Sequence, residues 1–445
     1  MNHSAENAGK LDFRKILPIV VILFVDLLGL SIMIPLLPFY AARFGANAFV
    51  IGILAATYPG LQVIGAPILT RLSDKVGRRP ILLVSQAGTF IGFVVLALAN
   101  SLWVLFISRM IDGISGANIS TAQAVITDST DESNRTRGLG LVGAAFGMGF
   151  IMGPVIAFGV LYATGGNYQA VAIAAAVFSF LSMLLTFFWL PETLDPTRAA
   201  AYRERGGFSF RAMFEALTRP TLGILLILMF AQQLAFGGYE QFFSVFTVNR
   251  LGLDATSTAF LLVLAGLAVV IVQGTIIGRW AKRYGDRWLV LMGLLMMGIS
   301  LTLTAFTPQM AVPWYDKAQV VASIQGHAAQ FQSINVSLPD QANTGWLGIL
   351  WLLLASFPGA IGGAVLHPGI NSLITKAVDK GETGGALGLS ASMYSAGNAI
   401  APLFYGTLFS VIGPSIPFLA GGLLLLVLWY VAVRKVGARY IVPLP

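Results

Sequence analysis

The chain has 445 residues, of which 56% are hydrophobic and only 10% are charged, and its formal net charge is +8. A soluble globular chain carries about 25% charged residues, so this composition argues against a water-soluble enzyme and against a disordered protein. The sequence contains no cysteine, which excludes disulfides, thiolate catalysis and cysteine-ligated metals. A membrane-spanning helix needs roughly 20 apolar residues, and this length accommodates about twelve such spans joined by short loops.

Apolar runs bounded by charged or turn residues predict twelve membrane-spanning helices. In chain order they cover residues 16–39, 48–70, 80–99, 102–127, 139–163, 168–190, 221–247, 256–278, 288–306, 345–373, 386–408 and 414–433. The first run lacks a small-residue cleavage site, so we expect it to be retained as a helix. Prolines inside the runs are expected to kink their helices, namely Pro35, Pro59, Pro154, Pro358 and Pro402.

The basic residues are distributed unevenly between the two sets of loops. Of the 27 lysines and arginines, 23 lie in the terminal segments and in the loops that follow even-numbered spans. The positive-inside rule therefore places both termini in the cytoplasm and predicts a multi-pass protein of the cell (plasma) membrane. A basic face beside anionic lipid also accounts for the net charge, so we expect the lipid bilayer and not nucleic acid as a partner.

The two halves of the sequence repeat one another. The segment 70–79 after the second span resembles 278–287 after the eighth, at an offset of 208 residues. The segment 138–154 of the fifth span resembles 386–402 of the eleventh, at an offset of 248 residues. The additional residues match a polar, almost uncharged insertion at 307–344. Parallel repeats of six spans are a transporter architecture, with the substrate site at mid-membrane between the halves.

We therefore predict an all-α integral membrane protein with 12 transmembrane helices, arranged as two parallel-related six-helix bundles around a central cavity. The N-terminal bundle covers 1–190, a cytoplasmic linker covers 191–220, and the C-terminal bundle covers 221–445 with 307–344 as an external insertion. A short helix is expected around 316–330. We expect the protein to be a monomer.

Three groups of residues resemble motifs of the major facilitator superfamily, most closely those of its twelve-span drug:proton antiporters, which include tetracycline efflux proteins. Asp74, Gly77, Arg78 and Arg79 match the superfamily signature between spans 2 and 3, although Thr70 replaces the usual first glycine. Arg109, Gly113 and Gly116 resemble the R-x-x-x-G-x-x-G motif of span 4. In span 5 the residues that resemble a motif enriched among exporters are Gly143, Gly147, Gly149, Gly153 and Pro154.

Charged residues inside apolar runs are the candidates for proton coupling. Asp26 lies about ten residues into the first span, or roughly 15 Å deep. A carboxylate at that depth costs several kcal/mol unless it pairs, is protonated or faces water, so Asp26 suits a proton carrier or a counter-ion for a cationic substrate. The alternative is a structural carboxyl group that is hydrogen-bonded to a neighbouring helix.

Glu240 in span 7, the counterpart of span 1, is the second carboxyl candidate, with an interfacial glutamate as the alternative. Arg109 and Asp112 are three residues apart and share a helix face. They either neutralise one another for structural reasons or act in proton coupling, and the family resemblance favours the second role for Arg109.

The loop residues Asp74, Gly77, Arg78 and Arg79 are interpreted as a latch on the cytoplasmic side, because a helix N-terminus favours a nearby carboxylate. The alternative is a set of solvated loop charges. Lys282 occupies the position of Asp74 in the second half, so we expect a one-sided or degenerate latch. The glycines of span 5 are small-xxx-small packing positions, which allow helices to approach closely.

Polar and aromatic residues within the spans are the candidates for a substrate pocket. The sequence contains three histidines and no carboxylate cluster with metal-ligand spacing, so neither a metal site nor a cofactor is expected. It also lacks a phosphate-binding loop, so this chain does not use ATP. The pocket candidates are Tyr58, Asn118, Gln123, Phe146, Gln233, Tyr239, Gln273 and Tyr394.

These observations favour a secondary active transporter, not an enzyme, that exports a small amphipathic or cationic compound in exchange for protons by alternating access. Proton-coupled uptake or facilitated diffusion of a nutrient, such as a sugar or organic acid, is the alternative. A non-transporting receptor or a lipid-modifying enzyme is a third class. It is disfavoured because the sequence shows no catalytic constellation and its loops are short.

Overall fold

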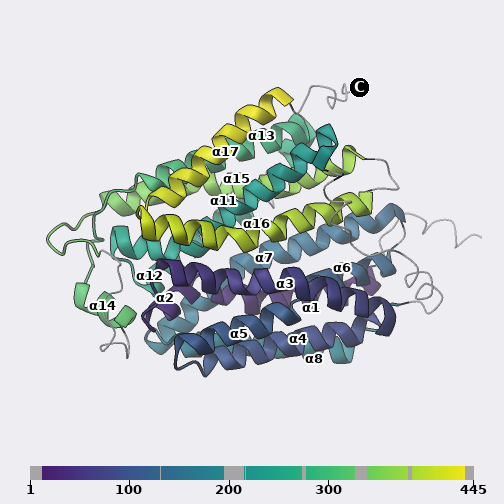
Figure 1. Cartoon of the computed structure of the whole chain (residues 1–445), viewed down its shortest axis with the longest axis horizontal. Coiled ribbons are helices and arrows are strands. Elements are labelled where there is room, and N and C mark those ends of the chain that lie inside the picture. Colours follow the sequence, from purple (N-terminus) through teal and green to yellow (C-terminus); the bar gives the residue numbers. More distant parts are fainter. Residues whose placement is uncertain are drawn as a thin grey trace, which may run out of the picture. The chain divides into compact units, whose positions relative to one another are not determined.

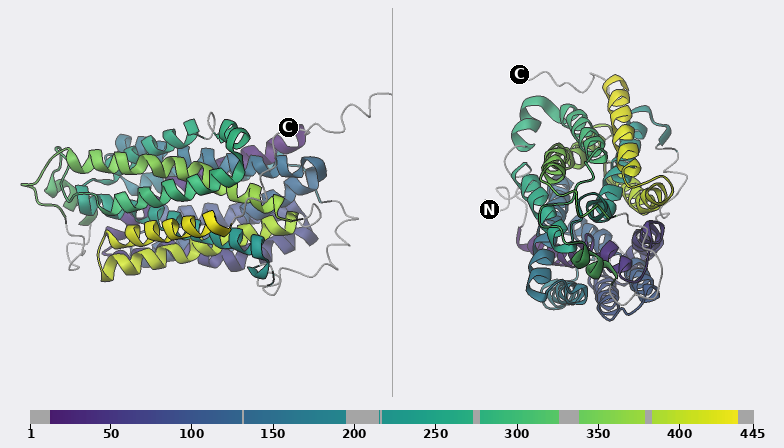
Figure 2. Two further views of the ribbon diagram at one scale, coloured as in Figure 1. Left: turned by 90° about the horizontal axis from the view of Figure 1, so that it is seen from above. Right: turned by 90° about the vertical axis from the view of Figure 1, so that its left-hand side faces the viewer.

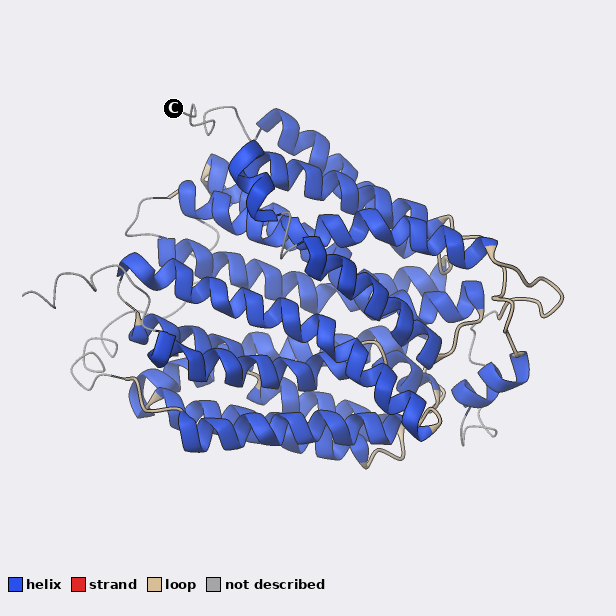
Figure 3. Cartoon of the chain, turned by 180° about the vertical axis from the view of Figure 1, so that it is seen from behind, coloured by secondary structure: helices blue, strands red, loops and turns tan. Residues whose placement is uncertain are grey.

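The computed structural model of the chain describes residues 13–130, 132–194, 215, 217–272, 277–325, 338–378 and 383–435. These residues form helices joined by loops, and one isolated β-bridge is the only extended pairing among them (Figure 3). Each of the twelve predicted apolar segments is mostly helical over its described part. The prediction of an all-α membrane protein is therefore confirmed.

The chain divides into two compact units. The first combines Met1–Met33 with Gly60–Phe208, and the second combines Ile34–Pro59 with Ser209–Pro445. Residues 34–59, which the sequence analysis assigned to the N-terminal bundle, thus group with the second unit. Helix α3 contributes to both units.

The helices are labelled in Figure 1 and are seen nearly end-on in the right-hand view of Figure 2. The first unit contains α1 (Phe13–Met33), most of α3 (Ala48–Val76), α4 (Arg78–Ala97), α5 (Leu102–Ser115), α6 (Asn118–Ser129), α7 (Glu132–Thr164) and α8 (Tyr168–Trp189). The second unit contains α2 (Leu37–Ala42), the start of α3, α11 (Pro220–Leu251), α12 (Ala255–Ile271), α13 (Ile277–Ala305), α14 (Lys317–Gln325), α15 (Leu347–Lys376), α16 (Thr383–Val411) and α17 (Ile416–Lys435).

Nine helices of the described chain are long and apolar enough to cross a membrane, and α12 is a shorter apolar helix. Two predicted spans, one of which contains α1, were expected as single helices but are interrupted. The first run breaks between α1 and α2, where Pro35 cannot donate a backbone hydrogen bond. In contrast, α7, α15 and α16 continue through Pro154, Pro358 and Pro402.

The predicted fourth span is also two helices, α5 and α6, separated at Gly116 and Ala117. Ser85 of α4 satisfies the backbone at this break, because its hydroxyl donates to the carbonyl of Ser115 and accepts from the amide of Ala117. The break between α5 and α6 is therefore stabilised by Ser85 from another helix. The continuous apolar run in the sequence does not reveal this partner. It places Asn118 at the first turn of α6.

Helix α1 is the centre of the first unit and packs against α6, α7 and α8. The glycines of α7 allow its backbone to approach α1, since a Cβ atom at Gly153 would lie 2.2 Å from the Ser31 hydroxyl and one at Gly149 would lie 2.9 Å from Leu27. The Ser31 hydroxyl donates to the carbonyl of Gly149 at 2.7 Å. These contacts have the close approach that the small-residue pattern predicts. The side chains at 143 and 146 lie outside the described residues.

The two ends of the insertion of the second unit lie next to each other. Ala311 pairs with Thr344, while the amides of Met310 and Val312 donate to the last carbonyls of α11. Helix α14 lies within this insertion, where a short helix was predicted (Figure 1). Residues 195–214 of the predicted linker lie outside the described residues.

Candidate functional site

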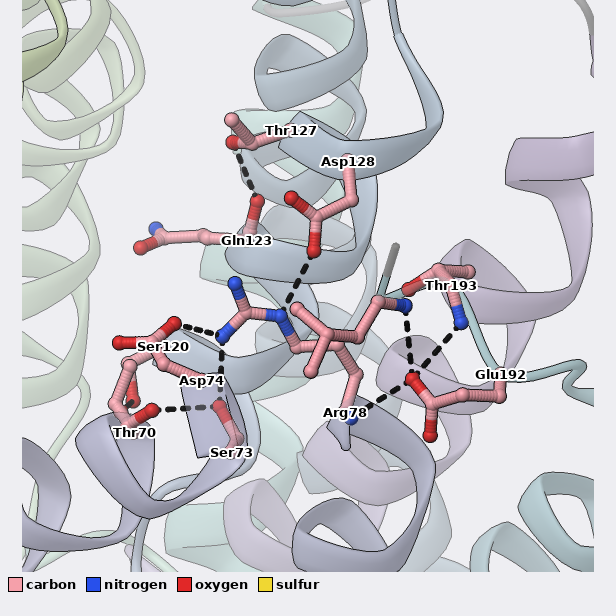
Figure 4. A network of polar contacts seen from close by, with 11 residues as sticks. Thr70, Ser73, Asp74, Arg78, Ser120, Gln123, Thr127, Asp128, Glu192 and Thr193 are labelled. Carbon is pink, nitrogen blue, oxygen red and sulfur yellow. Dashed lines mark hydrogen bonds and ion pairs between the residues drawn. The ribbon is translucent and has the colours of Figure 1, made fainter. Parts of the chain in front are cut away.

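Arg78 at the start of α4 is the centre of a polar cluster that joins three helices of the first unit (Figure 4). Its Nε donates to Asp128 of α6 at 2.8 Å, and its Nη1 contacts Asp74 of α3 at 2.5 Å and the Ser73 hydroxyl at 2.8 Å. The Arg78 residue is only 2% exposed. A buried guanidinium held by two carboxylates fixes the ends of these helices relative to one another.

The loop itself is shaped by Gly77 and Glu192. Gly77 has φ = 122°, a conformation that other residues rarely adopt, and a Cβ atom there would lie 2.5 Å from the Glu192 carboxylate. This carboxylate accepts from the backbone amides of Arg78 and Arg79, at 2.9 and 3.2 Å, and from those of Thr193 and Leu194. It thereby caps the N-terminus of α4.

The predicted latch residues Asp74, Gly77, Arg78 and Arg79 thus lie together, but Asp128 and Glu192 complete their cluster and were not predicted. Arg79 donates to the carbonyl of Phe187 near the end of α8 and lies over its ring. Asp128 is an acid at the end of an apolar run, and this is the sequence signal that could have identified it.

A second set of charges lies among the helices of the first unit. Asp26 of α1 is 6% exposed, while Arg109 and Asp112 of α5 are 3% and 1% exposed. Arg109 and Asp112 form an ion pair at 3.3 Å, and the guanidinium lies 5.3 Å from the centre of the Phe93 ring. Asp26 lies close enough to Asp112 for the two carboxyl groups to interact electrostatically.

Asn118 connects Asp26 to this set, because its amide donates to Asp26 Oδ2 at 2.8 Å and contacts the Thr89 hydroxyl at 3.4 Å. The other oxygen of Asp26, Oδ1, is buried without a well-formed hydrogen bond to a described residue, and the Ser182 hydroxyl of α8 lies close to this carboxyl group. Asp26 and Asp112 carry two carboxyl groups against the single guanidinium of Arg109. Burial of an uncompensated charge is costly, so the set is neutral when one of the carboxyl groups holds a proton.

The candidate residues of the second unit meet on α11, α15 and α16. Glu240 is half-buried, and its carboxylate has no hydrogen bond or ion pair within the described part of the chain. It lies within electrostatic reach of Tyr394, whose ring stacks on His367 at 5.1 Å. Tyr239, the residue before Glu240, packs against the Phe243 ring at 5.1 Å.

The remaining pocket candidates are divided among several places. The Gln233 amide of α11 donates to Asn398 of α16 at 3.1 Å, and Gln233 Oε1 is buried without a hydrogen-bond partner in the described residues. Gln123 lies beside the Arg78 cluster (Figure 4). Tyr58 is half-buried in the second unit. Gln273 and the side chain of Phe146 lie outside the described residues.

No group of three or more metal-ligating side chains occurs among the residues that the structure describes. The functional groups present are instead buried carboxyl groups, the two buried guanidinium groups of Arg78 and Arg109, and polar amides within apolar helices. These features define a class: a multi-pass membrane protein with ionisable groups placed inside its helical bundles.

Comparison with known proteins identifies the family. A family model described as the Major Facilitator Superfamily matches residues 19–350, and the chain belongs to this superfamily. The chain is 33% identical over 305 residues to the class E tetracycline resistance protein of Escherichia coli, covering 68% of this chain and 74% of that protein. It is 29% identical over 396 residues to the class B protein of Escherichia coli, covering 88% and 87%.

A solved structure with the same fold is that of the human organic anion transporter MFSD10 (TETRAN). It has a TM-score of 0.65 and 21% sequence identity, and the match covers 94% of this chain and 99% of that one. The chain is therefore a transport protein of the membrane and not an enzyme.

Proposed function

We propose that the protein is a proton-coupled antiporter that exports a small amphipathic or cationic compound from the cell. The observation that carries the proposal is the charge balance of the first unit, where Asp26 and Asp112 outnumber Arg109 in a buried setting. Such a set binds one proton when no cation is present and releases it when a cation neutralises the same carboxylate. Substrate and proton therefore compete.

Asp26 is the group that exchanges the proton in this proposal. Buried oxygens of both acids, Asp26 Oδ1 and Asp112 Oδ2, lack a hydrogen-bond donor among the described residues, but Asp112 pairs with the charge of Arg109 at 3.3 Å. A carboxyl oxygen that is buried and unpaired is stabilised by gaining either a proton or a cationic ligand. Arg109 influences whether the carboxyl groups hold the proton, since its positive charge favours ionised carboxylates near it.

The substrate class follows from the second unit and from the relatives. Glu240 places an unpaired carboxylate near Tyr394, and an aromatic face with a carboxylate suits an amphipathic cation. Tetracycline resistance proteins are relatives of similar length, so tetracycline is the first substrate to test. Both termini are proposed to be cytoplasmic, in a monomer of the plasma membrane, on the basis of the distribution of basic residues.

The driving force is sufficient for useful export. One proton that crosses a potential of about 100 mV supplies ~2.3 kcal/mol, and one pH unit adds ~1.4 kcal/mol. Together these sustain a gradient of roughly a few hundredfold. Protonation and substrate binding would each favour a different arrangement of the repeats, which is what alternating access requires.

The test uses purified protein in liposomes with an imposed pH gradient and tetracycline or a permanently charged dye as the probe. Antiport predicts that the probe accumulates on the acidic side, and the permanently charged dye excludes passive trapping of a weak base. Accumulation on the alkaline side would indicate symport, and movement that ignores the gradient would indicate facilitated diffusion. Either result would overturn the proposal in favour of nutrient uptake.

The proposed orientation has its own test. The chain has no cysteine, so a single cysteine can be introduced at Arg71 or at Lys317 without interference. A membrane-impermeant thiol reagent applied to intact cells should label the second variant and not the first. Labelling of the cysteine at 71 would reverse the orientation.

A further inference from the structure

The loop between α3 and α4 has a close structural counterpart within α13. Gly285 of α13 lies 208 residues after Gly77 and shares its positive φ, with values of 79° and 122°. Arg79 donates to the carbonyl of Phe187 in α8, and Arg287 donates to the carbonyl of Val433 in α17 at 3.2 Å. The repeat therefore extends to individual side chains: Arg79 and Arg287 each connect the start of one helix segment to the end of another helix by a hydrogen bond.

Within this shared frame the ion pair of the loop has reversed polarity. Arg78 pairs with Asp128 at 2.8 Å in the first unit. The positions 208 and 248 residues later, which are the two offsets of the repeat, are Asp286 and Lys376, and these residues form an ion pair at 2.5 Å. Lys282 in turn occupies the position of Asp74, so all three charges change sign; its side chain lies outside the described residues.

The two pairs differ in their exposure to solvent. The side chains of Arg78 and Asp128 are 3% and 5% exposed. Lys376 is 59% exposed and Asp286 is 13% exposed, and Asp286 also accepts from the Ser372 hydroxyl at 2.5 Å. A buried pair is costly to separate, whereas an exposed lysine can leave its partner for water at little cost.

We infer that Asp286 and Lys376 form a second, charge-inverted latch, which positions α13 against α15 and opens and closes during transport. This inference rests on the proposed function. The buried Arg78 cluster holds the ends of its helices more strongly, while the exposed pair sets how readily the end of α15 at Lys376 moves away from Asp286 of α13. The pair is a positioning device and does not contact the substrate, so it acts on turnover and not on substrate affinity.

The first experiment measures transport kinetics in the liposome assay. Lys376→Gln should lower kcat by about two- to fivefold with KM unchanged, which is the range of an exposed ion pair. Lys376→Asp should lower kcat by roughly tenfold or more, because it places a second carboxylate beside Asp286 and the two like charges repel each other. The exchange Asp286→Lys with Lys376→Asp should restore kcat to within about twofold of the unaltered protein. Lys317→Gln removes an exposed lysine elsewhere in the second unit and is the control.

Ionic strength provides a second readout. The Debye length falls from ~10 Å at 0.1 M salt to ~3 Å at 1 M, so high salt should reduce kcat of the unaltered protein toward that of Lys376→Gln. A structural defect would not produce this convergence. A single cysteine in place of Thr375 adds a measurement that needs no substrate: Lys376→Gln should raise its rate of thiol labelling about two- to fivefold.

Equal kcat and equal labelling rates with and without Lys376 would overturn the latch. A kcat of the exchange variant no higher than that of Lys376→Asp would overturn it as well. If the unaltered protein moves no probe while labelling still depends on Lys376 and on salt, the latch stands and the proposed function fails.

Discussion

Two buried charge clusters of the first unit differ in how completely their hydrogen bonds are made. In the Arg78 cluster each carboxylate has a donor, and Glu192 satisfies four backbone amides. Around Asp26, by contrast, one carboxylate oxygen and Asn118 Oδ1 are buried without a partner in the described residues. A cluster in which every carboxylate is bonded fixes a structure, whereas an unbonded carboxylate oxygen retains capacity for a proton or a ligand.

The largest expected effect is on the complete cluster. Arg78→Ala should lower the free energy of unfolding by about 3–5 kcal/mol, because it leaves the buried Asp128 and the adjacent Asp74 without their cation. Thermal unfolding in detergent measures the change. Arg71→Ala, at an exposed position of α3, is the control and should change little. Equal stability of the two variants would show that the cluster does not hold the fold.

The second prediction concerns the incomplete cluster. Asp26→Asn keeps an oxygen for the Asn118 amide but cannot exchange a proton. The substrate gradient driven by one pH unit, about tenfold or ~1.4 kcal/mol, should therefore vanish, while stability changes by about 1 kcal/mol or less. Asp316→Asn, at an exposed acid outside the spans, is the matched control. Full coupling in Asp26→Asn would remove this residue from the mechanism.

The third prediction separates the helix cap from the ion pairs of the complete cluster. The Glu192 carboxylate accepts hydrogen bonds from four backbone amides. Glu192→Gln replaces it with a neutral carboxamide, whose NH2 group is a donor and cannot accept these bonds. The expected loss is about 1–2 kcal/mol in the free energy of unfolding. Glu192→Asp keeps the charge and should lose less. If both variants lose the same amount, geometry and not charge is the cause.

The smallest expected effect is at the exposed edge of the complete cluster. Asp74 is 27% exposed, and Asp128 remains to neutralise Arg78 when it is removed. Asp74→Asn should therefore slow turnover by about two- to fivefold without changing KM. Initial rates over a range of substrate concentrations test this. A large rise in KM would contradict a latch and would place Asp74 in substrate binding.

The sequence predicted the helices well, since apolar runs and charged boundaries are local features. It did not predict the break at Gly116 and Ala117, because Ser85 stabilises that break from another helix. The interruption at Pro35 was expected only as a kink. Hydropathy records how apolar a segment is and not which backbone groups find partners.

The site was predicted in part. Asp26 and Arg109 were identified because charges are costly inside an apolar run. Asp128, Glu192, Asp286 and Lys376 were missed, since their roles depend on partners that are distant in sequence. The expectation of a degenerate second latch followed from comparing Lys282 with Asp74 alone. The ion pair at Asp286 appears only when both repeat offsets are applied together.

The insertion of the second unit leaves and rejoins the helices at the single bridge between Ala311 and Thr344. Because the bridge holds the two ends of the insertion together, the number of residues between them can change without moving α13 or α15. This segment is therefore a natural place to graft an affinity tag or a fluorescent reporter. A label carried there would follow the protein in single-molecule work without altering the apolar spans.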